Sequence, residues 1–298
     1  MRKLAFALSL FLSLSLFAQE DQLDVARQTI DNTNAYLESV GSDMRIVKAS
    51  FFVRGHGMPD FRSLRLGVKW PYRTLTYVVD GDDMTTDVPA AAAAATIVNA
   101  YDTWNDVQNA NVTTVQIPDD GTNFDVLDGT FHPVTGQCLT LVDITSANFN
   151  PATGVISTEA DIVVGGWEPA SYFSRCFGSN SILGVTLVLG SGDSNGDNYT
   201  DTLYAEQLYN EGFTWVLNGA QFLGPTEDIE TVVLHENGHA LGLDHTGGPN
   251  ANQPFKLQPN GRVFDPEAVM NPFYLGGEKR SLFPIDVAAL RALYTNPQ

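Results

Sequence analysis

HENGHALGLDH, residues 235–245, is the most informative segment of this 298-residue chain, and it holds three of its five histidines. His235 and His239 are four positions apart, so on a helix they lie on the same face. Two imidazoles on one helical face can bind a single tetrahedral zinc ion. The segment therefore predicts a helix over residues 227–242 that carries a metal site.

The other residues of this motif favour a catalytic zinc. Gly242 can adopt a positive φ, which ends the helix and turns the chain so that His245 supplies a third nitrogen. Three protein ligands leave one coordination position for water or substrate. Glu236 can then take a proton from that water and pass it to a leaving amine. Two alternatives stay open, namely a helix with solvated histidines and a zinc site without hydrolysis.

Composition and the N-terminus indicate an exported globular protein. Hydrophobic residues make up 43% of the chain, and 16 Lys and Arg against 35 Asp and Glu give a net charge of −19. That charge argues against a nucleic-acid partner or an anionic membrane surface. Arg2 and Lys3, the apolar run over residues 4–17 and Ala18 predict a signal peptide over residues 1–18, with a membrane anchor as the alternative. We expect an unanchored, monomeric mature chain.

The two cysteines, Cys138 and Cys176, bear on the same prediction of export, because exported proteins meet oxidising conditions. Under oxidising conditions Cys138 and Cys176 can form a disulfide, which would stabilise the fold by about 3–4 kcal/mol in the loop-entropy description. Two unpaired buried thiols are the alternative.

Apolar spacing and turn residues predict an α+β domain with one mixed sheet. Helices are expected near residues 20–40, 89–104, 227–242 and 286–294. Strands are expected at residues 75–79, 112–117, 139–144, 160–164 and 182–189. Residues 51–60 contain Gly and Pro without a period and are expected to be irregular.

The full HExxHxxGxxH pattern resembles that of the metzincin metalloendopeptidases. Thr246, directly after the third histidine, is similar to the Ser or Thr that the matrixin family carries there. Met270, 25 residues after His245, resembles the Met-turn beneath the zinc. The segment Pro272-Phe273-Tyr274 is similar to the wall of the matrixin S1′ pocket. Further similarities, such as Lys69-Trp70 before the first strand, extend the resemblance to about residues 66–296.

This resemblance implies a matrixin-like domain over residues 66–298, with a twisted mixed five-stranded sheet, three helices and a cleft over the zinc. It implies one catalytic zinc, Glu236 as the catalytic residue and a protein or peptide substrate, which would pair with residues 182–189 as the edge strand. Asp286 would either brace the Met-turn or act as a helix-start carboxylate. A non-catalytic exported binding or adhesion protein with a metzincin fold is the alternative function.

Residues 193–201, DSNGDNYTD, predict a calcium loop. Asp193, Asn195, Asp197 and Asp201 place oxygens at positions 1, 3, 5 and 9 of an EF-hand-like run. The glycine and position 12 depart from the EF-hand pattern, so a polar surface turn is the alternative.

Residues 54–60, RGHGMPD, are similar to the matrixin propeptide motif PRCGxPD, whose cysteine blocks the zinc. His56 stands where the cysteine would be, and imidazole is also a zinc ligand. Residues 19–65 would then be a propeptide whose His56 fills the open coordination position. The alternative is that His56 lies in a turn and residues 19–65 merely pack against the domain.

Overall fold

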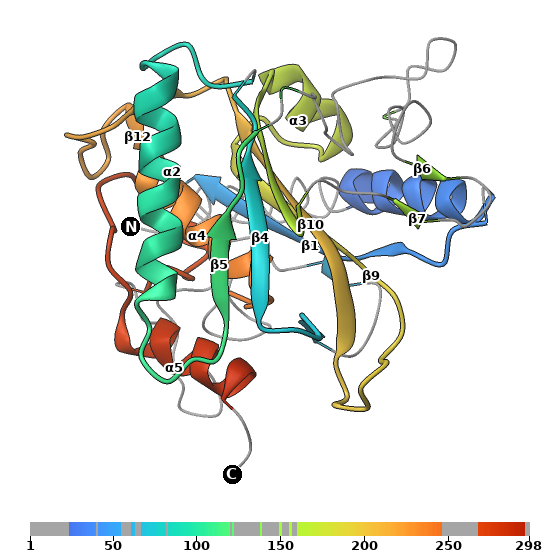
Figure 1. Cartoon of the computed structure of the whole chain (residues 1–298). Helices are drawn as coiled ribbons and strands as arrows, with labels where there is room; N and C mark the ends of the chain where they lie inside the picture. Colours follow the sequence, from blue (N-terminus) through green and yellow to red (C-terminus); the bar gives the residue numbers. More distant parts are fainter. Residues whose placement is uncertain are drawn as a thin grey trace, which may run out of the picture.

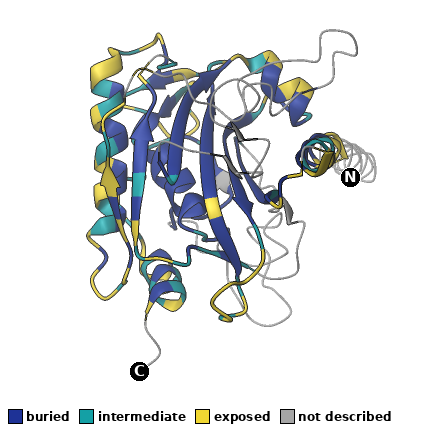
Figure 2. Cartoon of the chain, turned by 45° about the vertical axis from the view of Figure 1, so that its right-hand side comes forward, coloured by how far each residue is buried: buried dark blue, intermediate teal, exposed yellow. Residues whose placement is uncertain are grey.

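The computed structural model describes residues 24–39, 41–54, 61–62, 67–81, 83–119, 121, 138, 149–150, 155–156, 160–245 and 268–295. These residues form five helices around a mixed sheet, which confirms the α+β class (Figure 1). The buried residues concentrate in the strands and on the helix faces turned toward them (Figure 2).

The sheet has nine strands, and its main path runs β13-β1-β9-β10-β8-β4-β5. These strands are β13 (Phe273–Tyr274), β1 (Arg45–Arg54), β9 (Ile182–Gly190), β10 (Thr200–Asn210), β8 (Ile162–Glu168), β4 (Thr74–Val79) and β5 (Thr113–Gln116). β1, β9 and β10 pair antiparallel, whereas β10, β8, β4 and β5 pair parallel.

Smaller pairings complete the strand set. β2 (Phe61–Arg62) pairs with β1, and β3 (Val68–Lys69) pairs with β10. Two short ribbons are β11 (Thr214–Val216) with β12 (Thr226–Asp228), and β6 (Phe149–Asn150) with β7 (Val155–Ile156).

The expected five-stranded sheet with three helices is therefore too small. Two long strands were not predicted, namely β10 and β1. The last four residues of β1 fall in the segment expected to be irregular. The sequence of β1, RIVKASFFVR, has six apolar residues, and its eight central residues are all buried, as in a strand covered on both faces. The Gly and Pro residues that suggested irregular structure begin only at Gly55, after the strand has ended.

Helices cover both faces of the sheet. On one face lie α2 (Ala90–Asn105), α4 (Ile229–Ala240) and α5 (Pro284–Tyr294). On the other face lies a helix over residues 24–39, which confirms the helix predicted near residues 20–40. The same face carries α3 (Ala170–Cys176), which was not predicted. The predicted disulfide between Cys138 and Cys176 is present and joins the end of α3 to the chain before it.

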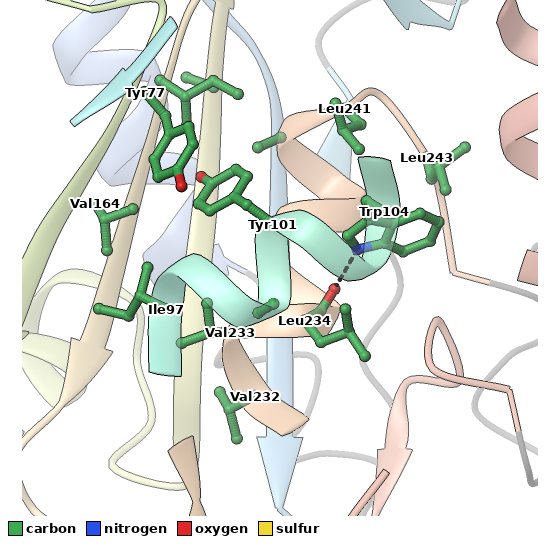
Figure 3. Packing of buried hydrophobic residues seen from close by; sticks show 14 of the residues in the cluster. Tyr77, Ile97, Tyr101, Trp104, Val164, Val232, Val233, Leu234, Leu241 and Leu243 are labelled. Carbon is green, nitrogen blue, oxygen red and sulfur yellow. Dashed lines mark hydrogen bonds between the residues drawn. The ribbon is translucent and has the colours of Figure 1, made fainter. Parts of the chain in front are cut away.

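The helix α4 is fixed by its start and by its packing against α2. Asp228 caps it by accepting a 3.0 Å hydrogen bond from the Thr231 backbone N–H, a contribution of about 1 kcal/mol. Trp104 of α2 donates its indole N–H to the Leu234 carbonyl at 2.8 Å (Figure 3). α4 is thus held rigidly at the turn before the histidine motif.

Candidate metal centre and cleft

The three histidines of the motif meet at one point. His235 and His239 project from α4, and Gly242, at φ +96°, turns the chain after the helix. The Nε2 atom of His239 lies 3.0 Å from that of His235 and 3.1 Å from that of His245, and the third pair is 3.2 Å apart. Gly242 therefore does what the sequence indicated, because it returns His245 to the helical pair.

Backbone carbonyls hold two of these rings in one tautomer. His235 donates from Nδ1 to the Val269 carbonyl at 2.7 Å, and His239 donates from Nδ1 to the Leu243 carbonyl at 2.8 Å. A carbonyl only accepts, so the proton of each neutral ring is on Nδ1 and the lone pair is on Nε2. This is the arrangement that metal-binding histidines show.

The nitrogen triangle fits a metal ion such as zinc. Ligand atoms of a tetrahedral zinc with bonds of 2.0–2.1 Å lie about 3.3 Å apart, close to the separations found here. All three side chains are buried, and among the described residues this is the group of His, Cys, Asp or Glu whose ligand atoms converge on a metal position. Three neutral nitrogens are a donor set that zinc accepts readily.

Glu236 follows His235 directly in the sequence, is buried, and lies against strand β9. Thr186 donates its hydroxyl to Glu236 Oε2 at 2.5 Å, which orients the carboxylate. A Cβ atom added to Gly184 would lie only 2.9 Å from Glu236 Oε1. Sequence analysis found Glu236 but missed Thr186 and Gly184, because an ordinary strand sequence gives no signal for a contact with a distant helix.

Met270 lies beneath the metal-binding helix. Its side chain is buried and contacts the turn of α4 at Gly238, where an added Cβ would overlap Met270 Sδ. Asp286, also buried, accepts from the backbone N–H groups of Met270 at 3.1 Å and Val269 at 2.9 Å. The same carboxylate accepts from the Phe283 N–H at the start of α5. Both readings of Asp286 are therefore correct.

The segment Pro272-Phe273-Tyr274 lies on the far side of β1. Phe273 and Tyr274 form β13, which pairs parallel with Val53 and Arg54. The Tyr274 ring lies 5.2 Å from that of Phe52, and its hydroxyl donates to the Gly277 carbonyl at 2.7 Å. The S1′ role of this segment stays a prediction.

The expectation that residues 182–189 form the edge of the sheet is wrong. β9 pairs with β10 on one side and with β1 on the other, along almost its entire length. Phe52 of β1 stacks on the His235 ring, with centroids 3.8 Å apart and planes 13° from parallel. The strand that covers β9 thus also covers the metal position.

The candidate calcium loop is a compact polar turn. Asp193 accepts from the backbone N–H groups of Gly196 and Asn198, and Asn195 accepts from that of Asp197. The Lys69 ammonium lies 2.6 Å from Asp197 Oδ2.

Asp201 belongs to β10 and accepts from the Ser194 N–H at 2.7 Å. Calcium binding by this loop stays a prediction. His56, Thr246, residues 139–144 and the segment predicted to be a signal peptide, residues 1–18, lie outside the described residues.

No family model matches this chain, and no curated protein matches its sequence. Within the described part of the chain, no helix combines the length and apolar character needed to cross a bilayer. Residue chemistry and geometry therefore carry the functional argument.

Proposed function

We propose that the chain is an exported zinc-dependent endopeptidase of the matrixin type. The observation that carries the proposal is the group of three Nε2 atoms 3.0–3.2 Å apart, with a buried glutamate directly adjacent in sequence. A structural zinc needs no such glutamate, and four protein ligands are its usual set.

His235, His239 and His245 would hold the zinc. Bound zinc supplies Lewis acidity, which polarises a carbonyl and acidifies a water molecule. Glu236 takes a proton from the attacking water and delivers it to the leaving amine. Thr186 donates its hydroxyl to one oxygen of that carboxylate and so orients the group. The burial of the site strengthens each of these electrostatic interactions.

The test uses a chain that can be cut between β2 and β3. A recognition sequence for a site-specific protease is inserted between residues 62 and 67, and the folded chain is assayed before and after cutting, here called the intact chain and the cut chain. Glu236→Gln should retain one zinc per chain and lower peptide hydrolysis by about 10²–10⁴-fold.

Glu230→Gln is the matched control, because Glu230 lies in the first turn of the same helix and pairs instead with Arg280 at 3.5 Å. It should retain wild-type hydrolysis. A cut wild-type chain that binds zinc but cleaves no peptide would reject the proposal and leave the non-catalytic binding protein as the better reading.

A further inference from the structure

β1 lies where a peptide bound beside the metal would have to lie. It runs antiparallel to β9 and parallel to β13, so it fills the space between them. Ser50 pairs with Thr186 and Phe52 pairs with Gly184, the two β9 residues that contact Glu236. An extended peptide paired with β9 would follow the same path.

The two faces of β1 contact different parts of the molecule. Phe51 and Val53 pack in the core beneath the helix at residues 24–39 and α3. Phe52, on the opposite face, packs in the core that contains α4 and stacks on His235. Two cations on this same face, Lys48 and Arg54, flank Phe52 in the sequence.

Each of these cations meets acidic or carbonyl partners near the metal-binding helix. Arg54 forms an ion pair with Glu227 and donates to the Gly224 carbonyl. Lys48 donates to the Leu243 carbonyl and lies 3.3 Å from Asp244 Oδ1. The partners therefore lie before and after the helix that carries the histidine pair.

Glu227 is completely buried, whereas the side chain of Asp244 is partly exposed. Loss of its cation should therefore cost Glu227 more than Asp244. Burial raises the pKa of the Glu227 carboxyl, whereas the Arg54 guanidinium acts to lower it. A buried carboxylate is strongly destabilised when it loses the cation that it pairs with. If β1 leaves the groove, a bound peptide that places a basic side chain where Arg54 was would therefore be favoured.

We propose that the groove between β9 and β13, which β1 fills in this chain, selects extended peptides with Arg or Lys two positions C-terminal to the residue over His235, and that Glu227 recognises this cation. The inference rests on the proposed peptidase function. It adds a specificity residue to that function.

The test measures peptide binding on the cut chain carrying Glu236→Gln, so that hydrolysis does not consume the probe. A fluorescent peptide with the sequence of residues 45–54, RIVKASFFVR, is added, and displacement of the N-terminal fragment is followed by fluorescence anisotropy. The peptide with Arg54→Ala should bind at least about 10-fold more weakly, as expected for loss of a desolvated charge pair.

Arg45→Ala in the same peptide is the matched control. It removes an equal charge, but among the described residues the Arg45 side chain donates to the carbonyls of Ser42 and Met44, at the opposite end of β1 from Glu227. It should bind like the unmodified peptide. On a chain that also carries Glu227→Gln, the penalty for Arg54→Ala should fall to about twofold or less, because the coupled partner is gone.

A labelled peptide that never displaces the fragment would show that β1 is a permanent strand and would overturn the inference. So would equal binding of the Arg54→Ala and unmodified peptides. Displacement with the expected selectivity, but without hydrolysis by the cut wild-type chain, would reject the peptidase and retain the groove. Hydrolysis by the cut chain without a preference for the cation would retain the peptidase and reject the role of Glu227.

Discussion

Replacing Gly238 by alanine would place a methyl group between the metal-binding helix and the methionine beneath it. The added Cβ would overlap Met270 Sδ and lie 2.9 Å from the Trp104 ring. Trp104 is held by its bond to the Leu234 carbonyl, so the ring has little freedom to move. Overpacking of this kind costs about 1–3 kcal/mol, and the better helix propensity of alanine returns up to about 1 kcal/mol. We expect a net loss of about 1–2 kcal/mol.

Urea unfolding of the zinc-loaded chain measures this loss, and a double-mutant cycle assigns its cause. Met270→Ala alone should cost about 2–5 kcal/mol because it opens a cavity. In the double variant the new methyl group partly fills that cavity, so the combined loss should be smaller than the sum by at least about 1 kcal/mol. Asn99→Ala, at an exposed position of α2, controls for helix propensity. Additive losses, or a Gly238→Ala chain as stable as wild type, would refute the packing argument.

Three further predictions concern buried charges and the metal. Asp286→Asn should lower stability by about 1–3 kcal/mol, as measured by urea unfolding, because a charged acceptor for three backbone N–H groups, among them that of Met270, becomes neutral. Arg54→Ala should lower the free energy of unfolding more at pH 8 than at pH 5. Loss of the Arg54 cation raises the already raised pKa of the Glu227 carboxyl further. The folded chain then retains its stability at low pH, where Glu227 is protonated, and loses stability as the pH rises through the pKa of the folded state. A penalty independent of pH would contradict this. Removal of zinc by a chelator should lower the melting temperature reversibly. The stability lost is about 4 kcal/mol relative to a chain at a zinc concentration 1,000 times Kd. The His239→Ala chain should show no change in melting temperature.

The cluster of three histidines was predictable from the sequence because its geometry is local. His235 and His239 are separated by one helical turn, and the conformation of Gly242 is a property of glycine itself, so both follow from short-range rules. Asp286 and Met270 were also anticipated, through the resemblance and a helix-start preference. Their contact with the histidine motif nevertheless depends on a chain reversal that no spacing rule describes.

The path of β1 was not predictable in this way. Nothing local distinguishes an apolar strand that completes a sheet from one that lies in a binding groove, because both require burial on two faces. The partner of Arg54 is Glu227, more than 170 residues away, and the stacking of Phe52 on His235 spans a similar distance. The sequence favoured irregular structure there because the glycines that follow Arg54 fell within the same window.

The position of β1 meets two demands that otherwise conflict. A peptidase that binds its substrate as an added strand needs an open edge, yet an exposed edge as apolar as ILGVTLVLG in β9 would pair with other chains. β1 protects that edge in the intact chain. Its inner face is anchored mainly by Arg54, Lys48 and Phe52 at the groove, whereas its outer face packs beneath the helix at residues 24–39. One cut between β2 and β3 would therefore break the covalent link between this covering unit, helix and strand together, and β9, and a competing peptide could then displace the unit as a whole.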